Sequence, residues 1–211
     1  MINSVNYHLY AITDRTWLRS GMTLADAVRA AIAGGATLIQ LREKNISTME
    51  YIDLAMEIKP VCERARIPLI INDDALVANA VGAGVHLGAS DGSIAAARQM
   101  LGENTIIGAT AKTIAQAQAA QQAGASYLGS GAIFGSTTKT DAKPMPLDTF
   151  SAICHAVSIP VVAIGGINAE NALQLKGTGA AGLCAVSAIF AAENIEAAAQ
   201  RLRGLAEEVC L

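Results

Sequence analysis

The chain has 211 residues, of which 52% are hydrophobic and 16% are charged, and its formal net charge is −3. A chain of this length can bury a large core in one domain, because α/β barrels often reach about 200 to 250 residues undivided. With Lys+Arg 15 against Asp+Glu 18, there is no global basic surface, and we expect no nucleic acid partner.

The apolar runs of the chain are short. Leu69–Ile71 and Val161–Ile164 are examples, and a membrane-spanning helix needs about 20 apolar residues, so we expect no membrane partner. The first residues, MINSVNYHLYAITD, lack the charged, apolar and small-residue regions of a secretion signal, which predicts a cytoplasmic protein. Four scattered cysteines match no metal or redox spacing, and we interpret them as small apolar residues: Cys62, Cys154, Cys184 and Cys210.

Transitions from helix to strand repeat along the chain. Four helical segments end in Gly-Ala before an apolar strand, in GGATLIQLR, VGAGVHLG, AGASYLGSG and TGAAGLCAVS. Glycine at this point suits a left-handed helix C-cap, which we predict for Gly35, Gly82, Gly124 and Gly179. Two further strands follow Ile-Pro, in RIPLIIND and SIPVVAIGG.

Two more apolar segments, YHLYAITD and NTIIGAT, bring the predicted strands to eight, separated by amphipathic stretches such as SIAAARQML and TIAQAQAAQQA. Strands that alternate with helices predict right-handed βαβ units and a parallel sheet. Eight such units favour the α/β class and a single (β/α)8 TIM barrel domain over residues 1–211. A doubly wound open sheet is the alternative, but it often has a glycine fingerprint after its first strand, and YAITDRTWL contains no glycine.

The second predicted strand, TLIQLREKN, alternates in character. Strand side chains have a period of two, so Ile39, Leu41 and Glu43 share one face, while Gln40, Arg42 and Lys44 share the other. We expect the apolar pair to pack against helices and the polar row to point inward and rise to the barrel mouth. An amide and two cations at the catalytic end of a barrel indicate an anion site.

Carboxylates follow the next two strands. Asn72 and Asp73 end the third strand, and Asp91 follows the fourth. Neighbouring loops of a barrel can bring these groups together, and paired carboxylates with an amide form a hard-oxygen site for a magnesium ion. We therefore predict Asp73 and Asp91 as ligands of Mg²⁺.

Two nearby residues are interpreted as structural. Asp74 precedes a helical segment, where aspartate is a favoured N-cap. His86 lies within an apolar strand, where we expect a hydrogen-bonded core residue, and it is left out of the predicted site.

The last two strands are followed by small residues. IGGIN places Gly165 and Gly166 before a predicted helix that Asn168 could cap, and AVSAI places Ser187 near another helix start. Glycine permits close approach of a ligand, and amides at helix starts attract anions. The loops after strands seven and eight of such barrels frequently bind phosphate, which we expect here.

The loop after the sixth strand is polar. It offers hydroxyl groups and one cation in Ser136, Thr137, Thr138 and Lys139. Such a loop can close over a phosphate-rich group and exclude water.

Seven segments in this order resemble the thiamine-phosphate synthase family along nearly the whole chain: LYAITD, GGATLIQLREK, IINDD, GVHLG..D, STTK, VVAIGGIN and AVSAIF. The resemblance implies a (β/α)8 barrel that joins hydroxymethylpyrimidine pyrophosphate to a thiazole phosphate, forming thiamine phosphate and pyrophosphate. It also implies a dissociative transfer of the pyrimidinylmethyl group without a protein nucleophile.

The resemblance further implies the following site roles. Gln40, Arg42, Lys44 and Asn72 hold the pyrophosphate end of the pyrimidine substrate; Ser136, Thr138 and Lys139 belong to the substrate clamp; Thr110 lies near the pyrimidine; Gly166, Val186 and Ser187 cradle the thiazole phosphate; Asp73 and Asp91 ligate Mg²⁺. Of these residues, Arg42, Lys44 and Lys139 are expected to be catalytic, since they stabilise the leaving charge.

The chain departs from the family pattern in three places. Ala89-Ser90 replace Gln-Glu before Asp91, Ala132 and Gly135 replace two prolines, and Thr110 and Lys112 replace a serine and a histidine. Other classes stay open: a related thiazole tautomerase, a Schiff-base aldolase using Lys44 or Lys139, and a non-catalytic phosphate-ligand sensor. The sequence also leaves a homo-oligomer open.

Overall fold

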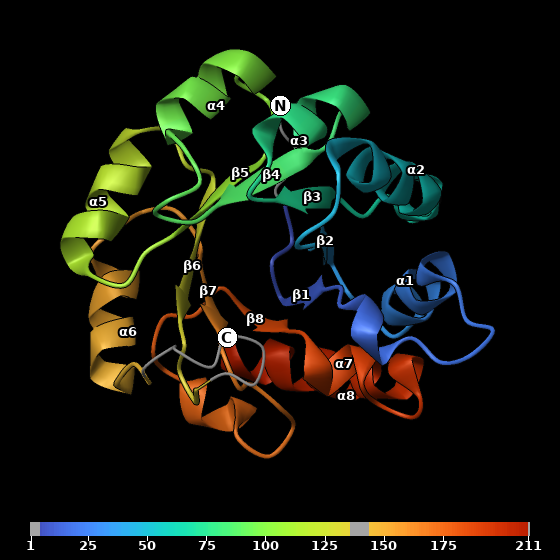
Figure 1. Cartoon of the computed structure of the whole chain (residues 1–211). Coiled ribbons are helices and arrows are strands. Elements are labelled where there is room, and N and C mark those ends of the chain that lie inside the picture. The colour runs from blue at the N-terminus through green and yellow to red at the C-terminus, as the bar shows by residue number, and fades with distance from the viewer. Residues whose placement is uncertain (1–4, 136–143, 211) are drawn as a thin grey trace.

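The protein folds as a closed barrel of parallel strands surrounded by helices, as Figure 1 shows for the computed structural model. The structure describes residues 5–135 and 144–210, so Ser136, Thr137, Thr138 and Lys139 lie outside the described residues. The strands pair in chain order, and β1 closes the ring against β8. This confirms the predicted (β/α)8 barrel and excludes the open sheet.

All eight strands are short and almost wholly buried. They are β1 (Leu9–Ile12), β2 (Leu38–Leu41), β3 (Leu69–Asn72), β4 (Gly84–Leu87), β5 (Ile107–Thr110), β6 (Tyr127–Gly131), β7 (Val161–Ile164) and β8 (Gly182–Ala185). Because side chains alternate along a strand, the strands together supply one core inside the barrel and another beneath the helices.

The helices are α1 (Leu24–Ala33), α2 (Thr48–Ala65), α3 (Ala75–Val81), α4 (Ile94–Leu101), α5 (Ile114–Gln122), α6 (Leu147–His155), α7 (Ser187–Phe190) and α8 (Ile195–Val209), with 3₁₀ helices η1 (Arg15–Trp17) and η2 (Ala172–Leu175). Capping boxes begin the first two α-helices: Thr23 with Asp26, and Ser47 with Glu50. Each box satisfies amide groups that the first helical turn leaves without partners.

The predicted left-handed glycines have positive φ angles: Gly35 (99°), Gly82 (63°), Gly124 (94°) and Gly179 (86°). Gly82 is the C-cap of α3, while Gly35 and Gly124 come directly after the C-caps of α1 and α5. At these three glycines the turn directs the chain from helix into the next strand, as predicted. Gly179 does not end a helix, because η2 finishes at Leu175 with Lys176 as its C-cap.

The prediction of an α-helix after β7 is wrong. Only η2 forms between β7 and β8. Asn168 accepts hydrogen bonds from the Glu170 and Asn171 amides (3.0 and 3.1 Å), so it starts a turn rather than capping an α-helix. Gly177 and Gly179 follow soon after with positive φ, and this conformation stops further helix growth.

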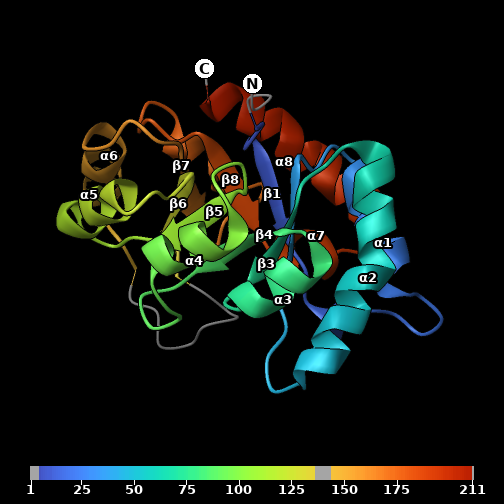
Figure 2. The ribbon, with the colours of Figure 1, turned by 90° about the horizontal axis from the view of Figure 1, so that it is seen from above.

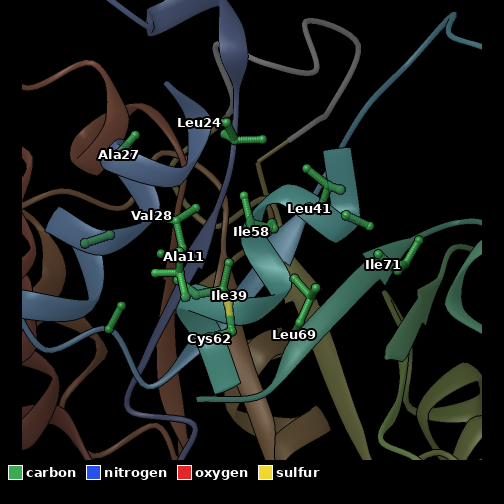
Figure 3. Close-up of a cluster of buried hydrophobic side chains, with 14 of the residues drawn as sticks. Ala11, Leu24, Ala27, Val28, Ile39, Leu41, Ile58, Cys62, Leu69 and Ile71 are labelled. Atoms are coloured by element: carbon green, nitrogen blue, oxygen red, sulfur yellow. The ribbon is translucent and has the colours of Figure 1, made fainter. Parts of the chain in front are cut away.

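The outer core lies between the barrel and its helices. Figure 3 shows a part of it, where Val28 of α1 and Ile58 and Cys62 of α2 lie beside strand residues such as Ile39. The inner core includes Tyr7, Tyr10 and Tyr127. All four cysteines are free; Cys62 and Cys184 are buried, as expected of small apolar residues, while Cys154 and Cys210 are half-buried.

The two ends of the barrel differ. Figure 2 shows the segments after β1 and β2 projecting at one end, while α8 finishes at the opposite end. The first of these ends holds the carboxyl ends of the strands, where barrels place their functional groups. No helix in the described ranges is long and apolar enough to span a membrane.

Candidate active site

The inward row predicted for β2 begins with Gln40. Its side chain is 1% exposed, and its Nε2 donates a hydrogen bond to the Tyr10 hydroxyl at 2.5 Å. Ile39 and Leu41 pack into the outer core. The alternation of β2 is therefore confirmed at these positions.

Arg42 and Lys44 continue this row beyond the end of β2. The Arg42 amide donates to Thr13 Oγ1 at 3.2 Å, and its half-buried guanidinium makes no hydrogen bond or ion pair within the described ranges. Lys44 is exposed and forms an ion pair with Asp73. Glu43 instead receives two hydrogen bonds from Arg15, both at 2.8 Å, so its charge is already neutralised.

Asp73 and Asp91 meet at the mouth. Asp91 accepts hydrogen bonds from the Gly88 amide at 2.8 Å and from Ser90 Oγ at 3.1 Å. A Cβ on Gly88 would lie 2.5 Å from Asp91 Oδ2, so this close approach requires glycine. Asp73 has φ 66° and donates its amide to the His86 carbonyl at 2.8 Å. The Asp73 and Asp91 side chains also lie within hydrogen-bonding reach of each other, so the predicted convergence of these two carboxyl groups is confirmed.

The two carboxyl groups differ in acidity. Burial raises the pKa of Asp73, and the hydrogen bond and charge of Asp91 raise it further, although Lys44 opposes the shift. Burial also opposes ionisation of Asp91, but hydrogen bonds from Asp73, Gly88 and Ser90 hold its pKa below the ordinary value. A cation bound between the two carboxyl groups would offset the repulsion that raises the pKa of Asp73.

The described part of the chain contains no group of three or more His, Cys, Asp or Glu side chains placed to hold a metal. The Asp73 and Asp91 pair alone suits a hard cation that takes its remaining oxygen ligands from water and from a bound anion.

Asp74 and Asn72 have different positions near this pair. Asp74 Oδ1 accepts hydrogen bonds from the Leu76 and Val77 amides, both at 2.9 Å, which confirms its predicted role as a helix cap. Asn72 is buried at the end of β3. The Tyr51 hydroxyl of α2 accepts the Asn72 amide at 3.1 Å and lies 2.8 Å from the Leu41 carbonyl, so it braces the ends of two strands.

On the β7–β8 side, the groups at the mouth are backbone atoms and small side chains. Gly165 and Gly166 have φ angles of 99° and 66°. A Cβ on Gly166 would lie 2.6 Å from the Phe134 carbonyl oxygen, because the segment after β6 packs directly against it. Ser187 begins α7, and Val186 is its N-cap. Since η2 replaces the α-helix expected after β7, any anion binding at the glycines depends on local amides.

Sequence reasoning missed a hydrogen-bonded chain inside the barrel, which we term the interior relay: Gln40, Tyr10, Tyr127, His86 and Thr110. The predicted core hydrogen bonding of His86 is confirmed, but this residue also contacts Thr110, a predicted substrate residue, at 3.1 Å. The available signal was the inward position of Tyr10 and Tyr127 on their strands, with Gly108 opposite Tyr127 leaving room for the large ring.

Comparisons with known proteins agree with these features. Residues 9–189 match the family described as thiamine monophosphate synthase. The chain is similar to thiamine-phosphate synthases of Ruminiclostridium cellulolyticum (47% identity, 96% of each chain) and Chloroflexus aurantiacus (46% identity, 95% of this chain and 93% of the relative). Its structure resembles thiamine phosphate pyrophosphorylase from Pyrococcus furiosus, with TM-score 0.88, 38% identity, and coverage of 97% and 98%.

Proposed function

The chain belongs to the thiamine monophosphate synthase family, and from this membership we infer that it condenses a pyrimidine and a thiazole moiety in thiamine biosynthesis. The substrates we propose are hydroxymethylpyrimidine pyrophosphate and thiazole phosphate, and the products are thiamine phosphate and pyrophosphate. The observation that carries this proposal is the convergence of Lys44, Asp73 and Asp91 at the barrel mouth.

The pyrophosphate end of the pyrimidine substrate is bound on the β2–β4 side. Arg42 has a guanidinium without a partner in the described part of the chain, and the exposed Lys44 follows two positions later in the same row. Asn72 supplies an amide at the end of the neighbouring strand. Ser136, Thr138 and Lys139, outside the described residues, complete this clamp in the proposal.

Asp73 and Asp91 are the proposed ligands of Mg²⁺. The pair fits this ion because both donors are carboxylates and because Asp73 is partly desolvated beside a second negative charge. When bound, the ion would screen the negative charge of the diphosphate. Lys44 already neutralises part of the charge of Asp73 and remains close enough to contact a bound diphosphate.

The proposed reaction breaks the C–O bond between the pyrimidinylmethyl carbon and the pyrophosphate, and the bonding electron pair leaves with pyrophosphate. The ring amino group stabilises the resulting cation, and the thiazole nitrogen then donates its electron pair to form the new C–N bond. Catalysis requires stabilisation of the leaving charge and correct placement of two reactants, and no protein nucleophile is needed. Arg42, Lys44 and Lys139 serve the first requirement.

The thiazole phosphate is assigned to the β7–β8 side. Gly166 offers backbone without a side chain, while Val186 and Ser187 begin the next turn of chain. This side has no need of a metal ion, because a phosphate can be held by backbone amides and hydroxyl groups. A cytoplasmic location and assembly into a homo-oligomer remain predictions.

The direct test is incubation of the purified protein with both substrates and magnesium, followed by mass detection of thiamine phosphate. We expect thiamine phosphate and pyrophosphate in equal amounts, and neither when one substrate is omitted. Absence of thiamine phosphate with both substrates present would refute the proposed function. Borohydride trapping of a covalent adduct with a sugar phosphate would instead favour the aldolase alternative.

A further inference from the structure

The interior relay joins five strands through side chains alone. Gln40 Nε2 lies 2.5 Å from the Tyr10 hydroxyl, which lies 2.7 Å from the Tyr127 hydroxyl. Tyr127 reaches His86 Nδ1 at 3.0 Å, and His86 Nε2 reaches Thr110 Oγ1 at 3.1 Å. Both ends of the relay are therefore residues assigned to substrate binding.

The Gln40 amide donates to the Tyr10 hydroxyl, while the Tyr10–Tyr127 contact and both contacts of the His86 ring fit donation in either direction. We assign the direction that starts at Gln40. Tyr10 then donates to Tyr127, Tyr127 donates to His86 Nδ1, and the imidazole, with its hydrogen on Nε2, donates to Thr110. Burial holds the pKa of both tyrosines well above the ordinary value, so both hydroxyls keep their hydrogens.

This direction determines what the two ends present. Gln40 uses its NH₂ group within the relay, which leaves its carbonyl oxygen as an acceptor. An acceptor suits the pyrimidine ring rather than the pyrophosphate end, to which the family resemblance assigned this residue. Thr110 accepts from His86, which leaves its hydroxyl hydrogen available as a donor. A 4-aminopyrimidine carries an N–H donor next to a ring-nitrogen acceptor, and this is the complementary pattern.

The surrounding glycines keep space for the relay. A Cβ on Gly108 would collide with the Tyr127 hydroxyl and lie 2.5 Å from His86 Nδ1. A Cβ on Gly129 would lie 3.1 Å from His86 Cε1. Tyr7 stacks on Tyr127 with ring centroids 5.1 Å apart, but its hydroxyl makes no hydrogen bond within the described ranges. Tyr7 is therefore a matched control for the two relay tyrosines.

We propose that Tyr10, Tyr127 and His86 are positioning residues that fix the acceptor of Gln40 and the donor of Thr110 toward an aminopyrimidine ring. The inference rests on the proposed function, since that function supplies the ring. It predicts that the relay selects a 4-amino ring over a 4-oxo ring, in which a carbonyl acceptor takes the place of the amino donor. Hydrogen-bonded sites reject such mismatched groups more strongly than apolar pockets do.

The test compares dissociation constants of the 4-amino and 4-oxo forms of the pyrimidine pyrophosphate in the wild type and in Tyr127→Phe, Tyr10→Phe and Tyr7→Phe. We expect the preference for the amino form to fall about 10-fold or more in the first two variants and to stay within about twofold in Tyr7→Phe. Equal weakening of both ligands, or an unchanged preference in Tyr127→Phe and Tyr10→Phe, would overturn the inference, because loss of packing alone weakens both forms alike.

A second measurement does not depend on turnover. Nitrogen NMR of the His86 ring in the wild type should show the hydrogen on Nε2, and His86→Gln assigns the signal. A hydrogen on Nδ1 would show that donation runs in the opposite direction and would refute the inference. Failure of the wild type to form thiamine phosphate would defeat the proposed function, while the NMR result would still decide the direction of the relay.

Discussion

On the β2–β4 side of the barrel mouth the groups available to a substrate are charged side chains, whereas on the β7–β8 side they are backbone atoms and small side chains. Lys44, Asp73 and Asp91 form a charged cluster on the first side. Gly165 and Gly166 lie on the second, packed against the chain that follows β6. We therefore expect function to fall when charged groups are removed from the β2–β4 side, and when side-chain atoms are added to the glycines of the β7–β8 side.

The largest effect is expected for Lys44→Met, which removes the cation of the charged cluster and leaves a side chain of similar length. Turnover should fall on the order of 10² to 10³, as for loss of one preorganised donor to a developing charge. Steady-state kinetics with both substrates saturating measures this loss. Lys176→Met is the control, since Lys176 is an exposed lysine that ends η2, ahead of β8. Turnover within about threefold of wild type in Lys44→Met would contradict the role of the charged cluster.

Removal of one carboxylate should mainly weaken the binding of Mg²⁺. Asp73→Asn keeps the size of the side chain but removes its charge, and the apparent affinity for Mg²⁺ should fall about 10- to 100-fold. Calorimetric titration with magnesium chloride measures this affinity, and so does the dependence of turnover on magnesium concentration. Asp74→Asn is a matched neighbour, because asparagine caps a helix as well as aspartate does, and its magnesium affinity should not change. Equal behaviour of the two variants would exclude Asp73 as a ligand.

Addition of one methyl group tests the opposite side. Gly166→Ala forces a Cβ against the Phe134 carbonyl at a φ of 66°, so the free energy of unfolding should fall by about 1 to 3 kcal/mol. The KM for thiazole phosphate should rise about tenfold, with a smaller change for the pyrimidine substrate. Gly204→Ala in α8 meets no atom within 4 Å and should instead stabilise the fold by about 0.5 to 1 kcal/mol. An unchanged KM for thiazole phosphate in Gly166→Ala would remove this side from the site.

The smallest effect concerns pH. The raised pKa of Asp73 means that a proton competes with the cation at this carboxyl group. As pH falls toward the raised pKa of Asp73, apparent magnesium affinity should weaken, because the proton is bound more often. The sign is opposite for the metal-free protein, whose stability gains from Asp73 as pH falls through a pKa that folding has raised. Magnesium affinity that rises on acidification would contradict this view of the pair.

The barrel itself could be predicted because its signals are local. A glycine with positive φ after a helix, as at Gly82, and a proline before a strand need only a few residues to be recognised. The inward position of Gln40 and the cap at Asp74 likewise follow from periodicity and from one helix start. The prediction of an α-helix after β7 was wrong because its signal was also local. Asn168 begins a turn with the same side-chain hydrogen bonds that cap a helix.

The interior relay could not be predicted from such signals. Tyr10 and Tyr127 are 117 positions apart, and each looks like an ordinary core residue within its own strand. Their contact depends on closure of the ring, which brings inward residues of β1 and β6 across the barrel axis. His86 was correctly predicted to be a hydrogen-bonded core residue from its position within an apolar strand. Its hydrogen bond to Thr110 could not be predicted, because that contact also depends on how the strands pair in the barrel.

The close contact between Gly108 and the Tyr127 ring has a consequence for how this sequence can change over time. Because a methyl group there would collide with the Tyr127 hydroxyl, a lineage that acquired alanine at position 108 would first need a smaller residue at position 127. The two sites should therefore accept substitutions in a fixed order, and a library that randomises both together should recover functional pairs that single-site libraries miss.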